Sequence, residues 1–230
     1  MSGHSKWHSI KHKKGAADAK RGKLFTRIIK ELTVAARDGG GDPDSNPRLR
    51  TVIADAKAAN MPADNIKRAI RRGTGEEPGV SYEEVTYEGY GPGGVALLLE
   101  VLTDNKNRAV GEIRHLLTKH GGNLGSSNSV AWMFDKRGHL LIEKSAADEE
   151  TLMTAAIEAG ADDFSDDNGH WEILSAPESF DAVAEAVRAL GVEPASAQVA
   201  MRPKNFVMLE GKPAQQMLKL IGALDDLDDI

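Results

Sequence analysis

The chain of 230 residues contains no cysteine, which excludes disulfide bonds, thiolate metal sites and cysteine nucleophiles. It also has no long apolar run. The longest unbroken aliphatic stretch covers residues 95–99, whereas about 20 residues are needed to span a bilayer. No apolar stretch follows the basic N-terminus, so we expect no signal peptide, no membrane contact and a cytoplasmic location. The remaining composition, 40% hydrophobic and 28% charged, is that of a globular protein.

Motifs for catalysis and for nucleotide or metal binding are also missing. Gly89, Gly91 and Gly94 match the glycine pattern of a dinucleotide-binding loop, but Pro92 interrupts it and a strand-like segment follows. That order indicates a hairpin turn. Three histidines near the N-terminus are four residues apart, but they lie among lysines, which oppose a metal cation. We therefore predict a protein that is not an enzyme and that uses no metal or cofactor.

Charge is distributed unevenly along the chain. Residues 1–73 contain 17 Lys and Arg against 7 Asp and Glu, a net charge of +10. Residues 74–230 contain 12 against 28, a net charge of −16. A basic segment joined to an acidic body is typical of a protein whose basic part meets a polyanion. Because the acidic body would repel nucleic acid, we expect contact to be confined to residues 1–73.

The basic segment is predicted to form an arm followed by a helical bundle. Residues 1–14 contain no acid and only two large apolar residues, Trp7 and Ile10, so we expect a flexible basic arm. Apolar residues then recur with helical periodicity, and glycines or prolines separate the periodic stretches. The three predicted helices cover 16–38, Pro47 to about Asn60, and Pro62 to Arg72. Short loops between them predict a compact bundle.

Cations of this segment are the candidate contacts, because Lys and Arg neutralise phosphates and release counterions. On the first helix, Lys20, Lys23, Arg27, Lys30 and Arg37 fall within an arc of about 100°. Trp7 can either stack on an exposed base or pack the arm against the bundle. No base-reading motif is visible. The predicted nucleic-acid contacts are Lys6, Trp7, Lys11, Lys13, Lys14, Lys20, Arg21, Lys23, Arg27, Lys30, Arg48, Arg50, Arg68, Arg71 and Arg72.

Beyond a linker at 74–81, strands and helices alternate. The predicted strands are 84–90, 95–103, 130–134, 139–143, 161–164, 171–175, 198–202 and 206–209. The predicted helices are 106–120, 148–159, 177–190 and 213–224, and an acidic tail covers 225–229. From residue 139 to 202 the order is that of the split βαβ, ferredoxin-like plan.

These patterns predict an α+β protein with a three-helix bundle followed by two α/β domains. The expected domains are the basic helical segment at 1–73, a middle domain built from 82–134 and 206–230, and an inserted ferredoxin-like domain at 135–205. No dimerising heptad is visible, so a monomer is expected.

Several motifs carry a resemblance to a known family. They are GHSKW (3–7), AKRGKLFTRIIKEL (19–32), GGGDPDSNPRLR (39–50), YEGYGPGG (87–94), DNKNR (104–108) and GGNLG (121–125). With these, the chain resembles the YebC/PmpR family from residue 3 to about 225. The resemblance implies a helical bundle and two α/β domains around a cleft, and a cytoplasmic protein that is not an enzyme.

Two functions are compatible with the resemblance. One is a ribosome-associated translation factor that contacts RNA and relieves stalling at proline-rich stretches. The other is a DNA-binding transcriptional regulator. Both would use the basic segment, so the expected partner is the ribosome with its RNA, or DNA. A basic arm with a stacking group favours RNA, because duplex readers present a helix to a groove, often as dimers.

Overall fold

The computed structural model describes residues 17–167 and 169–230, with side chains from Arg21 onward. These residues divide into two compact units, one made of 17–130 with 209–230 and the other of 131–208. The helical segment thus shares a unit with the middle α/β domain, and the division falls a few residues from the expected positions at 134 and 206. The predicted α+β class, with an N-terminal helical region, is confirmed.

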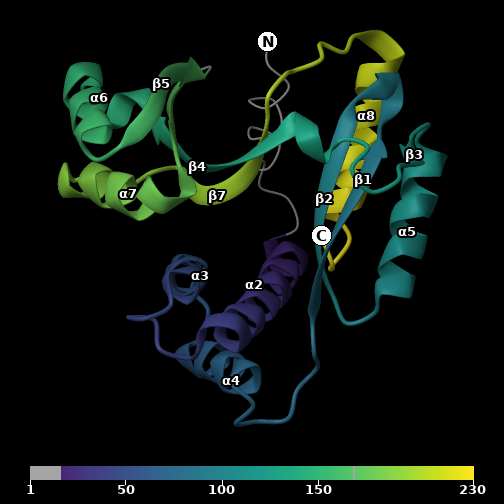
Figure 1. Cartoon of the computed structure of the whole chain (residues 1–230), viewed down its shortest axis with the longest axis horizontal. Helices are drawn as coiled ribbons and strands as arrows, with labels where there is room; N and C mark the ends of the chain where they lie inside the picture. The colour runs from purple at the N-terminus through teal and green to yellow at the C-terminus, as the bar shows by residue number, and fades with distance from the viewer. Residues whose placement is uncertain (1–16, 168) are drawn as a thin grey trace. The chain divides into compact units, whose positions relative to one another are not determined.

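The helical region consists of α2 (Ala17–Gly39), α3 (Pro47–Ala58) and α4 (Ala63–Gly73), drawn in purple and blue in Figure 1. Their apolar faces form one core. Its buried residues are Ile28, Leu32, Ala35, Ala36, Leu49, Val52, Ala56, Met61, Ile66 and Ala69. Asn46 caps α3 by accepting a hydrogen bond from the Leu49 amide, and Pro47 follows at the first helical position.

Gly73 lets α4 approach α2 closely. A Cβ atom at this position would lie 2.3 Å from the main-chain oxygen of Thr33 and 2.8 Å from the Cβ of Ala36. No side chain fits there, so a glycine is needed where the last turn of α4 crosses α2. The crossing places the basic end of α4 beside the middle of α2.

The middle domain has a three-stranded sheet, ordered β2-β1-β3. Its elements are β1 (Glu83–Tyr90), β2 (Ala96–Thr103), α5 (Lys106–Lys119) and β3 (Asn123–Leu124). The glycine motif forms a hairpin turn at Pro92–Gly94 between antiparallel β1 and β2, as predicted. Helices α5 and α8 (Gly211–Asp225) pack against this sheet through Ile113, Leu117 and Leu220 (Figure 1).

The other unit has the predicted ferredoxin-like order of elements. They are β4 (Phe134–Glu143), α6 (Glu149–Glu158), β5 (Ala161–Asp167), β6 (His170–Ser175), α7 (Phe180–Ala189) and β7 (Ser196–Pro203). The sheet is antiparallel with order β5-β6-β4-β7. Helices α6 and α7 bury its apolar face around Leu140, Ile142 and Ile173 (Figure 1).

Two predicted strands were wrong. The segment 130–134 contains a 3-10 turn at Ala131–Met133, and strand β4 begins only at Phe134. β4 continues through the polar residues 135–137, because these residues pair with β7. Their sequence has no alternation of apolar and polar residues, so no strand was predicted there. The segment 206–209 has no regular structure. Its aromatic and branched residues suit a strand, but no described strand pairs with it.

Candidate nucleic-acid interface

The predicted contacts are only partly within the described residues. Lys6, Trp7, Lys11, Lys13 and Lys14 lie outside them, and so does the side chain of Lys20. The remaining nine side chains lie on α2, α3 and α4, which share one compact unit. Their surroundings differ: some are paired with acidic groups and others are not.

The basic face of α2, formed by Lys23, Arg27 and Lys30, meets the end of the chain. The Lys23 ammonium donates to the main-chain oxygen of Asp226 at 2.6 Å and lies 3.2 Å from its carboxylate. Arg27 Nη2 lies 3.6 Å from Asp225 Oδ1. We call residues 225–229 the acidic C-terminal segment. The basic side of α2 is therefore partly covered by this segment.

Lys30 and Asp229 are the buried centre of this contact, with side-chain exposures of 7% and 8%. Lys30 Nζ lies 2.5 Å from Asp229 Oδ1, and it also donates to the main-chain oxygens of Asp228 and Leu102. Asp229 Oδ2 accepts from Thr103 Oγ1 at 2.9 Å and from Arg108 Nη2 at 3.0 Å. Lys30 is therefore part of an interior contact and not of an exposed cationic surface.

The charge state of Asp229 follows from these partners. Burial alone would raise the pKa of its carboxyl group, because the charged form loses hydration. Hydrogen bonds from Lys30, Arg108 and Thr103 outweigh that effect and hold the pKa below its usual value. The same contact, together with Asp104, raises the pKa of Arg108. The network is thus an ionised cluster that ties α2 to β2, α5 and the C-terminal segment.

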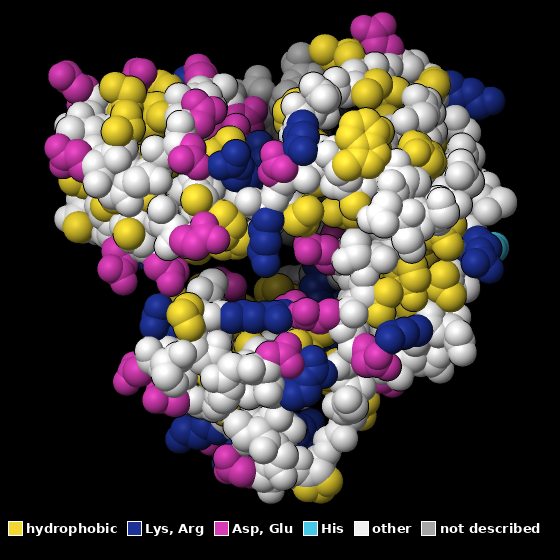
Figure 2. Space-filling model, viewed as in Figure 1, with side chains coloured by type: hydrophobic (Ala, Val, Ile, Leu, Met, Phe, Trp, Pro, Cys, Tyr) yellow, Lys and Arg dark blue, Asp and Glu magenta, His cyan; other side chains and the backbone are white. Residues whose placement is uncertain are grey.

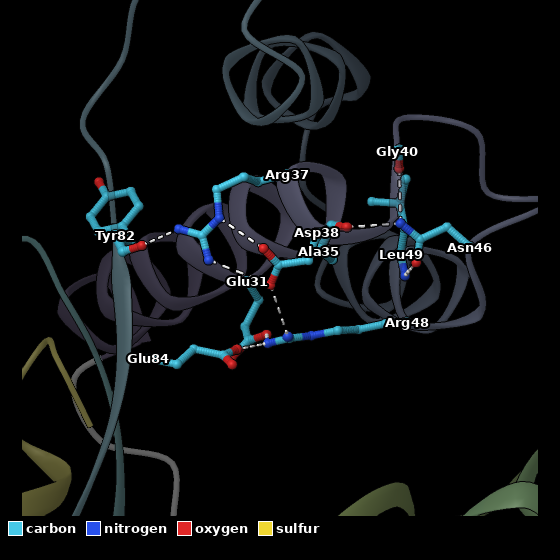
Figure 3. A network of polar contacts seen from close by, with 10 residues as sticks. All are labelled: Glu31, Ala35, Arg37, Asp38, Gly40, Asn46, Arg48, Leu49, Tyr82 and Glu84. Atoms are coloured by element: carbon cyan, nitrogen blue, oxygen red, sulfur yellow. Dashed lines mark hydrogen bonds and ion pairs between the residues drawn. The ribbon is translucent and has the colours of Figure 1, made fainter.

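Arg48 is also paired, as Figure 3 shows. Its guanidinium contacts the carboxylates of Glu31 at 2.9 Å and of Glu84, with Asp38 at 3.9 Å. Burial lowers the pKa of Arg48, but the hydrogen bonds to Glu84 and Glu31 together with their charges raise it by more. The net shift of the pKa is therefore upward. Arg37, next to this group, donates to the Tyr82 carbonyl and to Asp38. These arginines join the helices to the start of β1.

Two further predicted arginines have local partners. Arg71 forms a close ion pair with Glu77, with Nη2 and Oε1 2.6 Å apart. Arg50 donates to the main-chain oxygen of Pro43 at 3.3 Å. Both contacts join residues within the helical region or the linker after it, and they hold these side chains in defined positions.

The exposed outer face of α4 has a different character. Arg68 and Arg72 are four residues apart, so they lie on the same helix face beside Lys67, and all three are exposed. None of them forms an ion pair within the described part of the chain. The stem of Arg72 packs against Gly79, where an added Cβ would be 3.1 Å from its Cγ. Elsewhere on the helical region, Figure 2 shows blue and magenta side chains next to one another.

The acidic partners of the α2 cations were not predicted from the sequence. Asp225, Asp226 and Asp229 were recognised only as a charged tail, yet they contact the predicted α2 stripe. A weak signal was present. The two segments have opposite charge: the stripe carries a cation at each helical turn over residues 20–30, and four of the five residues 225–229 are aspartates.

A metal centre and a membrane-spanning helix are not found among the described residues. No group of three or more His, Asp and Glu side chains there is placed to hold a metal ion. None of the described helices is both long enough and apolar enough to cross a membrane.

The described residues form an α+β protein with a cationic helical region at the N-terminal end. Residues 5–76 match the family profile described as the TACO1/YebC protein N-terminal domain, and residues 82–230 match the TACO1/YebC second and third domain. The chain belongs to this TACO1/YebC family, as the sequence motifs predicted.

Similar proteins span nearly the whole chain. A probable transcriptional regulatory protein of Acidobacterium capsulatum is 61% identical over all of this chain and 93% of its own length. One of Geobacter sulfurreducens is 56% identical with the same coverage. A crystal structure of a conserved hypothetical protein from Aquifex aeolicus has a TM-score of 0.86 and 47% identity, covering 96% of this chain and 91% of that one.

Proposed function

We propose that this chain is a non-enzymatic regulator of gene expression that binds ribosomal RNA through its N-terminal helical region and relieves stalling at proline-rich stretches. The names of its relatives support a regulator of gene expression. The ribosome and the stalling step rest on the family resemblance of its motifs. The proposed RNA contact rests on exposed cationic residues of α4. The proposed location of the protein is the cytoplasm.

The observation that carries the proposal is the exposed face formed by Lys67, Arg68 and Arg72. These cations have no acidic partner among the described residues, whereas Lys30, Arg48 and Arg71 do. An unpaired cation gains more from a phosphate, because no existing ion pair has to be broken first. The packed stem of Arg72 also reduces the side-chain entropy that binding would cost. The outer face of α4 can therefore bind a phosphate at a lower cost than the paired cations Lys30, Arg48 and Arg71.

The placement of these cations favours a backbone contact over base reading. Helices that enter a major groove present residues of their N-terminal part to base edges. In α4 that part carries the acidic Asp64, and the arginines follow in the second half. Phosphate contact without base reading suits a structured RNA surface, where shape and backbone dominate.

A DNA-binding transcriptional regulator is the second candidate. It is favoured by the name of the relatives, which are called probable transcriptional regulatory proteins. The same cations would serve it, because duplex DNA and RNA both present phosphates. The two candidates differ in the target that is preferred at equal salt.

The deciding experiment compares the two targets directly. The full chain is sedimented with bacterial ribosomes, and its binding to a random 30-base-pair DNA duplex is measured in the same buffer at about 0.15 M salt. Sub-micromolar ribosome binding with weak duplex binding supports the translation factor. Preference for particular duplexes, with no ribosome binding, supports the transcriptional regulator instead.

A pair of variants tests the interface. R68A/R72A removes both arginines of the exposed face and keeps helix propensity high. It should weaken ribosome binding and reduce the salt slope by about 1.4–1.8 units, because two phosphate contacts are lost. K212A/K219A is the matched control: it removes the same charge from exposed positions of α8. Equal losses in both variants would mean that only net charge matters.

The stalling step has its own test. A cell-free translation reaction is programmed with a message containing consecutive proline codons, and full-length product is measured with and without the protein. We expect more full-length product with the wild-type chain and less of that gain with R68A/R72A. A message without the proline codons should show no change. No gain on the proline message would remove this part of the proposal.

A further inference from the structure

The acidic C-terminal segment lies on the basic side of α2, and its contacts form two zones. The inner zone is the buried cluster of Lys30 and Asp229. The outer zone consists of Lys23 with Asp226, and Arg27 with Asp225. Figure 1 marks the C-terminus near α2, and both belong to one compact unit. The segment is thus anchored at Asp229 and carries two acids along the helix.

The outer pairs are weak by the standards of ion pairs. Lys23 and Asp226 have exposed fractions of 41% and 82%, and Arg27 and Asp225 have 37% and 39%. Exposed pairs of this kind lose most of their attraction to solvent and salt. A phosphate that approaches α2 can therefore take the place of Asp225 and Asp226, while the inner pair stays closed.

The local electrostatics of α8 do not explain the position of these acids. Asp225 is the last residue of α8 and Asp226 is its C-cap, where the helix dipole disfavours negative charge. No basic residue lies in the last turn of α8 to compensate. The cations that compensate come from α2. The acids lie where the dipole of their own helix disfavours them, and each is paired with a cation of α2.

We propose that residues 225 and 226 are an intramolecular competitor that occupies the phosphate-binding side of α2 until RNA displaces it. Lys23 and Arg27 then add to the contacts of α4 only in the bound state. The Lys30–Asp229 anchor keeps the segment close, so it returns when RNA leaves. This inference rests on the proposed function, because it assumes RNA binding by the helical region.

Neutralising the competitor should strengthen RNA binding. The probe is a fluorescent 20-nucleotide oligouridylate, titrated with full-length protein at 0.15 M salt, where charges beyond about 8 Å are screened. D225N/D226N should lower Kd about fourfold to twenty-fivefold, because each exposed pair given up accounts for about twofold to fivefold. Both changes remove acids from the C-terminal end of α8, so the variant should melt at the wild-type temperature or slightly above it.

Asp228 provides a matched control for net charge. It is exposed, two residues from Asp226, and its carboxylate forms no ion pair with α2 in the described residues. D226N should lower Kd about twofold to fivefold, and D228N should lower it less. In a K23A/R27A background, D225N/D226N should give no gain beyond the effect of charge shown by D228N. Equal effects of D226N and D228N, or a gain that persists in K23A/R27A, would overturn the proposal.

Failure of this inference and failure of the proposed function give different results. If R68A/R72A weakens oligouridylate binding but D225N/D226N changes nothing, α4 binds RNA and the segment does not compete. If neither the wild type nor D225N/D226N binds the probe or ribosomes, both ideas fail. If D225N/D226N binds the probe and the wild type does not, the acidic segment blocks RNA binding almost completely in the wild-type chain.

Discussion

Lys30 and Asp229 are 199 positions apart in the sequence, yet their charged atoms lie 2.5 Å apart in the interior of the protein. The pair connects the middle of α2 to the end of the chain. Thr103 and Arg108 donate further hydrogen bonds to the Asp229 carboxylate. This cluster fixes the helical region against the middle domain, and it explains why a lysine on the predicted cationic stripe is buried.

Removing the carboxylate alone should be costly. D229A leaves the buried Lys30 ammonium with main-chain oxygens only, and loss of one partner of a buried pair costs about 3–5 kcal/mol. Urea unfolding measures the change. D228A, at an exposed neighbouring position, should alter the free energy of unfolding by less than about 0.5 kcal/mol. K30M/D229L should recover most of the loss, because an apolar pair leaves no uncompensated charge. A D229A variant as stable as D228A would contradict the buried cluster.

The cluster should also make stability depend on pH in acid. The pKa of Asp229 is below its usual value in the folded protein, and the unfolded value is about 3.9. A lowered folded pKa contributes stability above the unfolded pKa, and the contribution is lost as pH falls through the folded pKa. The difference in unfolding free energy between wild type and D229N should be constant from pH 7 to 5 and shrink below about pH 4. Urea midpoints at several pH values test this, and a difference that stays constant down to pH 3 would count against it.

Asn46 should contribute more than an ordinary helix cap. Its Oδ1 accepts from the Leu49 amide at 3.0 Å, and its Nδ2 donates to the carbonyls of Ala35 and Gly40, each at 2.8 Å (Figure 3). N46A should cost about 1–3 kcal/mol, because the side chain is buried and three polar groups lose a partner. N46D should recover little, since its carboxylate would face two carbonyl oxygens. Thermal unfolding beside the exposed control S45A measures both effects, and full recovery in N46D would show that only the cap matters.

Local signals account for much of what the sequence predicted. Asn46 before Pro47 marks the start of α3, and Asn105 marks the start of α5, because caps and fixed φ angles act within one turn. The order of strands and helices gave the ferredoxin-like unit, since this order leaves few topologies.

The partners of the cationic residues were not predictable in the same way. A helical wheel gives the direction of Lys30 on α2 but not what packs against it, and its partner lies at the other end of the chain. The prediction of a strand at 206–209 was wrong for a related reason. A strand needs a neighbour to accept its hydrogen bonds, and composition alone does not supply one.

Two glycines of the helical region should respond in opposite ways to the same substitution. Gly73 touches α2, where an added Cβ would lie 2.3 Å from the Thr33 oxygen, so G73A must push α4 away and should cost about 1–3 kcal/mol. Gly22 lies inside α2 with nothing within 4 Å of an added Cβ, so G22A should stabilise by about 0.5–1 kcal/mol. Urea unfolding of both variants measures the contrast. Because G73A displaces the helix that carries Arg68 and Arg72, it should also weaken ribosome binding, whereas G22A should not. A G73A protein with wild-type stability would mean that α2 and α4 do not cross at this glycine.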